Sequence, residues 1–94
     1  MNVIQATYAS VFDALADTPS EAENLRLRAE LMHALTAHIH AQGWTQTEAA
    51  KHCNLTQPRI NDLLRGRMSR FSLDALVNIA AALGQHVKLE LQAA

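Results

Sequence analysis

A short stretch of the chain, residues 57–62, holds side chains that could contact the edges of nucleic-acid bases. The amide of Gln57 can donate and accept hydrogen bonds together, as the N6/N7 edge of adenine requires. Arg59 could pair with a guanine or with a phosphate, and the sequence alone does not choose between them. The Asp62 carboxylate could accept from a cytosine N4, or it could bind Arg59 or Arg65 within the chain.

Pro58 and Asn61 complete this candidate base-reading set. On a helix over residues 57–65, a rotation of about 100° per residue places Pro58, Asn61 and Asp62 opposite the apolar side chains. Proline is tolerated at this point because the first N–H groups of a helix have no partner within it. It removes a donor, so it could offer only an apolar contact, such as one to a thymine methyl.

A basic stretch surrounds these residues. Residues 43–71 carry a net charge of +3, whereas residues 1–42 carry −3 and residues 72–94 carry −1. A local basic region can orient a protein on DNA even though its total charge is −1. The arginines could contact phosphates without reading sequence, or they could lie in a solvated loop. The candidate phosphate-binding residues are Thr45, Gln46, Arg65, Arg67, Ser69 and Arg70.

Two closely spaced helix starts would position both sets of residues. Thr45 can cap a backbone N–H while Glu48 reaches back to the capping residue, which is a capping box, so a helix begins with the next residue. That helix must end before Asn54, which tolerates the left-handed conformation, and Thr56 can then cap a second helix. Residues 45–66 are therefore predicted to form a helix-turn-helix.

The run Thr-Gln-x-x-Ile-x-x-Leu-x-x-Gly from Thr56 to Gly66, followed by Arg67 and Arg70, resembles the DNA-binding domains of phage Cro/cI-type repressors. Over roughly residues 18–91, the chain is also similar to small Xre-family regulators that include HigA-type antitoxins. The segments that carry this longer resemblance are residues 24–28, 30–32, 43–46, 57–63 and 71–77.

The resemblance implies an all-α fold of four to five helices and a pair of glutamines at the DNA. In that pair Gln46 would help to bind a phosphate and hold Gln57 against an adenine. For the antitoxin members the resemblance implies a second partner, a RelE-like ribonuclease toxin. Such toxins are generally basic, so the acidic residues 1–42 would be a suitable surface, although acidic helices are also ordinary solvent-facing surfaces.

Two further helices are expected to flank the helix-turn-helix. Thr18 can cap a helix that begins at Pro19 and is stopped by Gly43. Ser72 can cap another that runs to about Leu83. Both would contribute apolar faces to the same core.

The chain as a whole divides into three predicted segments. Residues 1–17 would be an N-terminal arm or a short helix, and residues 18–84 the helix-turn-helix domain. Residues 85–94 would be a C-terminal strand, because polar and apolar side chains alternate over residues 85–91, which is typical of a half-buried β-strand. A lone strand needs a partner edge, which either Val3 and Ile4 or the same strand of a second copy could supply. We expect the second copy, paired across the two-fold axis of a homodimer. The residues expected in this contact are Val87, Leu89 and Leu91.

Composition narrows the remaining possibilities. The chain has 94 residues, of which 49% are hydrophobic and only 4% aromatic, and this favours one small helical bundle. There is no membrane span, no secretory signal and only one cysteine, Cys53, so a cytoplasmic protein is expected. The histidines lack the i, i+4 spacing of a helical zinc site, and no catalytic motif stands out. No metal, cofactor or enzyme activity is predicted.

These observations together predict a dimeric, sequence-specific DNA-binding transcriptional repressor that regulates its own gene. Its recognition helix, residues 57–65, would lie in the major groove of an inverted-repeat operator in double-stranded DNA. The alternative, which one molecule could combine with the first, is an antitoxin that also binds and neutralises a RelE-like toxin.

Overall fold

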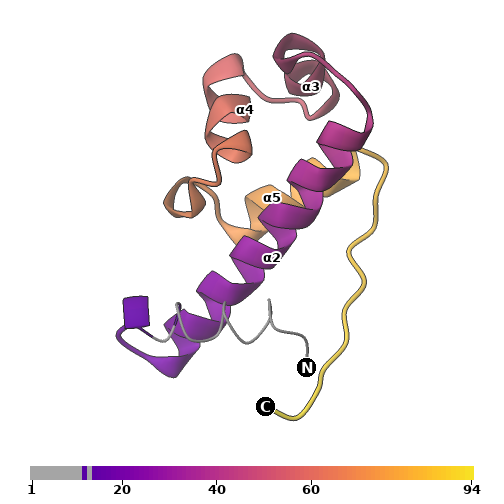
Figure 1. Ribbon diagram of the computed structural model, residues 1–94. Helices are drawn as coiled ribbons and strands as arrows, with labels where there is room; N and C mark the ends of the chain where they lie inside the picture. The colour runs from indigo at the N-terminus through magenta and orange to yellow at the C-terminus, as the bar shows by residue number, and fades with distance from the viewer. Residues whose placement is uncertain (1–11, 13) are drawn as a thin grey trace.

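The computed structural model describes residue 12 and residues 14–94, and the regular secondary structure of this part of the chain is helical. Its longest helix, α2, spans Pro19–Ala41. The two short helices that follow are α3 (Gln46–His52) and α4 (Gln57–Leu64). A 3-10 turn, η1 (Met68–Arg70), leads into α5 (Leu73–Ala82), as Figure 1 shows. Most of the expected N-terminal arm, residues 1–11 and 13, lies outside the described residues.

Polar caps begin these helices where the sequence predicts them. In each cap the side-chain oxygen accepts a hydrogen bond from the backbone N–H three residues later, which satisfies one donor of the first turn. At α3 the capping box is complete, because the Glu48 carboxylate accepts in turn from the backbone N–H of Thr45 at 3.1 Å. The capping residues are Thr18, Thr45, Thr56 and Ser72.

The turn between α3 and α4 depends on two kinds of residue. Asn54 has a φ of 57°, the left-handed conformation that ends α3. Ala49 and Ala50 are buried on α3, and their small side chains let α4 pack close against it. The loop after α4 begins at Gly66, whose φ of 71° lies in a region that residues with a side chain rarely adopt.

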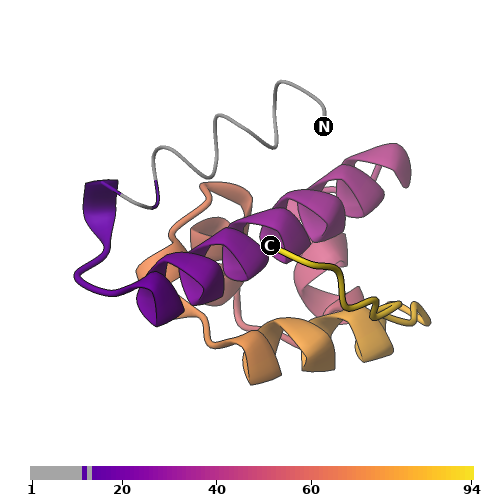
Figure 2. The same cartoon turned by 90° about the horizontal axis from the view of Figure 1, so that it is seen from below.

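The helices share one hydrophobic core. Helix α2 packs against α5 and also contacts α4 and η1, and Figures 1 and 2 show it running diagonally through the molecule. Its apolar face is buried at Met32, Leu35 and Ile39. Burial also raises the pKa of the Cys53 thiol. The fully enclosed side chains at the centre of the core are Phe71, Ile60, Leu63 and Leu76.

The predicted C-terminal strand is wrong for the described chain. Residues 85–94 contain no regular secondary structure, and Leu89 and Leu91 have relative exposures of 88% and 102%. Alternation makes a strand possible, but its backbone groups need a neighbouring edge to bind. The part of the chain that the structure describes contains no strand whose edge could bind residues 85–94. The dimer contact at Val87, Leu89 and Leu91 stays a prediction.

Candidate nucleic-acid interface

The first turn of α4 exposes the leading base-reading candidate. Gln57 is solvent-exposed, and its Nε2 donates to the Thr47 hydroxyl on α3 at 2.8 Å. The resemblance predicted that Gln46 would hold Gln57, whereas here the residue that holds it is Thr47. Gln46 is itself exposed at the first position of α3. The two short helices are thus joined by a polar side-chain contact at the surface.

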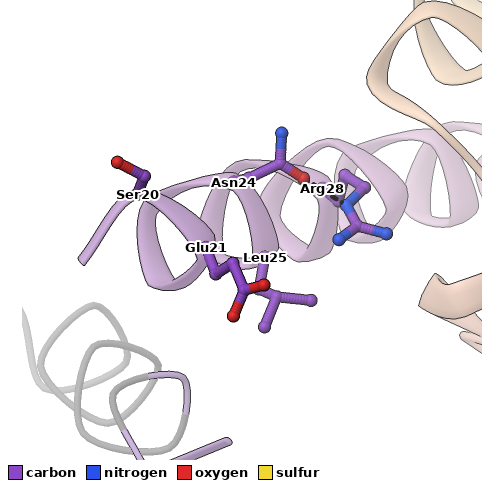
Figure 3. Close-up of a pocket in the computed structure, with 5 residues that line it drawn as sticks. All are labelled: Ser20, Glu21, Asn24, Leu25 and Arg28. Atoms are coloured by element: carbon purple, nitrogen blue, oxygen red, sulfur yellow. Dashed lines mark hydrogen bonds between the residues drawn. The ribbon is translucent and has the colours of Figure 1, made fainter. Parts of the chain in front are cut away.

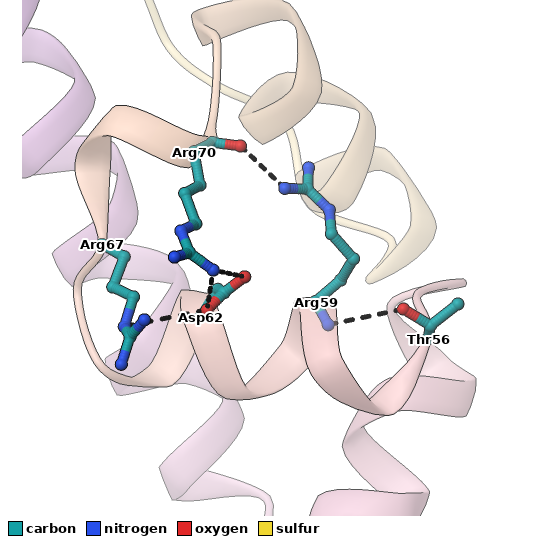
Figure 4. Close-up of polar contacts among 5 residues, drawn as sticks. All are labelled: Thr56, Arg59, Asp62, Arg67 and Arg70. Atoms are coloured by element: carbon teal, nitrogen blue, oxygen red, sulfur yellow. Dashed lines mark hydrogen bonds and ion pairs between the residues drawn. The ribbon is translucent and has the colours of Figure 1, made fainter.

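The other predicted base-reading residues differ in accessibility. Pro58 is exposed and Asn61 is half-buried, both on α4. Arg59 is half-buried because its side chain extends toward the loop after α4, as Figure 4 shows. Its Nη1 donates to the Arg70 carbonyl at 2.7 Å, and its guanidinium carbon lies 4.0 Å from the centroid of the buried Phe71 ring. This cation–π contact and the hydrogen bond link α4 to the loop.

Asp62 is the buried charged residue of this surface. Its side chain is only 10% exposed, and both of its carboxylate oxygens lie 3.2 Å from Arg70 Nη1. Arg67 Nε lies 3.7 Å from the same carboxylate (Figure 4). An ion pair within the chain was one predicted alternative for Asp62, but its proposed partners, Arg59 and Arg65, were wrong. The carboxylate faces the loop and its two arginines.

Helix α2 holds the same loop from the other side. Arg28 Nη1 lies 3.2 Å from the Met68 carbonyl oxygen and 3.4 Å from that of Phe71, and it donates to both. Arg28 Nε donates to the Asn24 side chain at 2.7 Å. Arg28 also borders a shallow surface pocket of about 490 Å³ along the first turns of α2, drawn in Figure 3. Its guanidinium is therefore shared between α2 and the loop.

All of the predicted phosphate-binding residues are exposed. Those at the start of α3 and those after α4 lie on opposite sides of the base-reading turn in the sequence, so they could flank a bound groove. The Thr45 hydroxyl is already part of the cap, where it accepts from the Glu48 backbone N–H and donates to the Glu48 carboxylate. The hydrogen bond from the Thr45 backbone N–H, and after it the one from the hydroxyl, lowers the pKa of the Glu48 carboxyl. The exposed set is Thr45, Gln46, Arg65, Arg67, Ser69 and Arg70.

A family model described as a helix-turn-helix domain matches residues 14–92, which is most of the chain. The chain belongs to the helix-turn-helix domain family. No protein among the curated sequences matches it. Membership of this family supports DNA as the partner, and α3 and α4 form the motif itself.

Two other kinds of site were sought among the described residues. None of the described helices is long and apolar enough to span a membrane. Among the described residues, no group of three histidine, cysteine or acidic side chains is placed to hold a metal ion. The surface around α4 is the candidate site because it belongs to the helix-turn-helix motif.

Sequence reasoning gave no role to three residues that shape this surface. Thr47 binds Gln57, Phe71 lies under Arg59, and Arg28 holds the loop from a position about forty residues earlier. For Thr47 the sequence offered one signal, its place in the first turn of the helix that begins after Thr45. The roles of Arg28 and Phe71 depend on how α2 packs against η1, which no local spacing reveals.

Proposed function

We propose that this helix-turn-helix protein is a sequence-specific DNA-binding transcriptional repressor that regulates its own gene. The observation that carries the proposal is the surface of α4. It exposes Gln57 and Pro58 at its start, while Arg59 and Asp62 contact the loop after α4, residues 66–72, which carries Arg67 and Arg70. A short helix with an exposed polar first turn suits insertion into the major groove.

The candidate residues then fall into two sets with different roles. Gln57, Pro58 and Asn61 face the bases, with the Gln57 amide suited to adenine. Arg65, Arg67, Ser69 and Arg70 contact phosphates beyond the end of α4, and Gln46 with Thr45 contacts them at the start of α3. Arg59 contacts the Phe71 ring and the Arg70 carbonyl, and it thereby fixes the orientation of the loop relative to α4.

A homodimer is part of the proposal. One recognition helix per chain reads a short half-site, and two-fold pairing brings two such helices to adjacent major grooves about 34–36 Å apart. The exposed Leu89 and Leu91, with Val87 beside them, supply an apolar surface that a second copy would cover. An inverted repeat in the DNA would match the symmetry of such a dimer.

A reporter placed behind the DNA upstream of the protein's own gene tests this function. The protein should lower expression of the reporter, and footprinting should protect an inverted repeat in that fragment. Gln57→Ala should relieve the repression while leaving the helical circular dichroism spectrum unchanged. An unprotected upstream fragment together with unchanged reporter expression would remove the autoregulatory repressor from consideration.

A second candidate function, binding of a basic toxin, is supported by the acidic first half of α2. Glu21, Glu23 and Glu30 are exposed there. The basic side chains in this described half of α2 are Arg26, which pairs with two of these carboxylates, and Arg28, which binds the loop after α4. A RelE-like ribonuclease is the expected partner, by the resemblance to HigA-type antitoxins. The test begins with the neighbouring reading frame: a basic product that elutes with this protein and loses ribonuclease activity in the complex would support it. A neighbouring frame without such a product would oppose it.

A further inference from the structure

The Asp62 cluster combines burial with unequal charge. One carboxylate, 10% exposed, faces two guanidiniums whose side chains are 41% and 54% exposed, those of Arg67 and Arg70. The cluster therefore has a net charge of +1, with the negative charge inside and the positive charges toward solvent. Two arginines without this carboxylate would present a charge of +2 to any phosphate backbone.

The cluster also fixes where the arginines lie. The Arg70 guanidinium contacts Asp62 through Nη1, and the Arg70 carbonyl accepts from Arg59, so both ends of this residue are bound to α4. Arg28 holds the carbonyls of Met68 and Phe71 on either side. A loop held by these contacts offers its positive charges in one position relative to the recognition helix.

From this juxtaposition we infer that Asp62 is a specificity-determining residue. It offsets one of the two loop charges and holds the guanidiniums at a fixed place, so that they meet phosphates in good geometry only when α4 is seated in the groove. Attraction to arbitrary duplexes is reduced, because that attraction depends on the number of phosphates neutralised and not on register. Asp62 is thus a positioning residue and not a base reader. The inference rests on the proposed DNA-binding function.

Asp62→Asn tests the inference, because it removes the charge and nearly keeps the shape. The probe is a 20-base-pair duplex of random sequence, titrated at several salt concentrations. We expect the variant to bind it about threefold more tightly at low salt, and the slope of log K against log salt to steepen by about 0.9. The ratio between affinities for an operator selected from random DNA and for the random duplex should fall. The charge-matched control, Glu30→Gln on α2, should leave the slope as it is.

The outcomes separate this inference from the proposed function. If the natural protein binds no duplex, the proposed function itself fails. If it binds but Asp62→Asn gives an unchanged or shallower slope, the inference is overturned, and a residue that only stabilises the fold would give this result with a lower melting temperature.

Should Asp62→Asn not fold, the comparison moves to a background without the shorter of the two ion pairs, that with Arg70. Arg70→Gln is then compared with the double variant Asp62→Asn, Arg70→Gln, while Arg67 is kept in both. We expect the double variant to have the steeper slope by about 0.9, since only the negative charge differs. Equal slopes would overturn the inference in this background as well.

Discussion

Two clusters of arginine and carboxylate side chains in this protein are built in opposite ways. On α2, one arginine, Arg26, binds the two carboxylates of Glu23 and Glu30 along the helix surface. At the end of α4, one carboxylate, Asp62, binds two arginines of the following loop. The first cluster has an excess of negative charge and the second an excess of positive charge.

Burial separates them further. The α2 carboxylates are about 60% exposed, at 59% and 60%, whereas the Asp62 side chain is 10% exposed. Exposed pairs along a helix contribute only a few tenths of a kcal/mol each. A buried carboxylate must keep its partners, because removal of one leaves an uncompensated charge. The α2 cluster therefore contributes little to the stability of the fold, while the Asp62 cluster holds the loop after α4 against α4.

The largest expected effect is on DNA binding, from removal of the two loop arginines. Arg67→Ala with Arg70→Ala should weaken binding to operator and random duplex alike by about 10- to 100-fold at 0.1 M salt. The salt slope should fall by one to two units, since each neutralised phosphate contributes about 0.9. Fluorescence anisotropy across a salt series measures both quantities.

The α2 cluster supplies the matched control for that variant. Arg26→Ala also removes an arginine that is paired with carboxylates, but one on a helix surface away from the loop. It should leave the salt slope near that of the natural protein. Equal losses for both variants would mean that overall charge, and not the loop, governs DNA binding.

The next effect concerns sequence reading. Gln57→Ala should weaken operator binding by about 1–3 kcal/mol and random-duplex binding much less, because only the base contact is lost. Asn78→Ala, exposed on α5, is the control and should change neither. If Gln57→Ala weakens both duplexes equally, Gln57 is not a base reader.

A smaller effect is expected on stability from the contact that joins α2 to the loop. Arg28→Ala should lower the free energy of unfolding by about 1 kcal/mol, since the carbonyls of Met68 and Phe71 lose a charged donor. Urea denaturation measures this change. Arg28→Lys keeps the charge but not the fork that spans two carbonyls, and it should recover only part of the loss. If Arg28→Ala has the same free energy of unfolding as the natural protein, Arg59 and Asp62 alone hold the loop.

The smallest effect is a pH dependence of the α2 cluster. The hydrogen bond from Arg26 lowers the pKa of Glu23 in the folded protein. The ion pair therefore stabilises the fold above the usual glutamate pKa of about 4.3, and this contribution is lost as pH falls through the lower folded value. Melting curves between pH 6 and about pH 3 should show a slightly smaller decline for Arg26→Ala than for the natural protein. An identical decline in both proteins would place the pair outside the stability of the fold.

Local signals in the sequence predicted most of the fold. Capping at Thr45 and Thr56 depends on residues at most three positions apart, so the starts of α3 and α4 were predicted correctly. The turn at Asn54 likewise depends on the conformations open to one residue. The strand over residues 85–94 was wrong, because a strand needs a partner that its own pattern does not specify.

The candidate residues of the site follow from the sequence more readily than their contacts do, and their contacts with DNA stay a prediction. The loop arginines and Gln57 could be selected by their place after and at the start of a helix. The ion pair between Asp62 and Arg70 could not, because the helix end and Gly66 turn the chain between them, and several arginines were equally available. Which arginine meets a buried carboxylate is decided by how the loop packs on α2.

The central claim is that α4 with its loop reads the sequence of duplex DNA. The most direct test is titration of the natural protein against two duplexes, one selected from random DNA and one with the same bases scrambled, across a range of salt concentrations. We expect log K to fall linearly with log salt for both. The selected duplex should bind more tightly by a factor of about 10³ or more. Equal affinity for the two duplexes, or affinity that does not change with salt, would contradict the account.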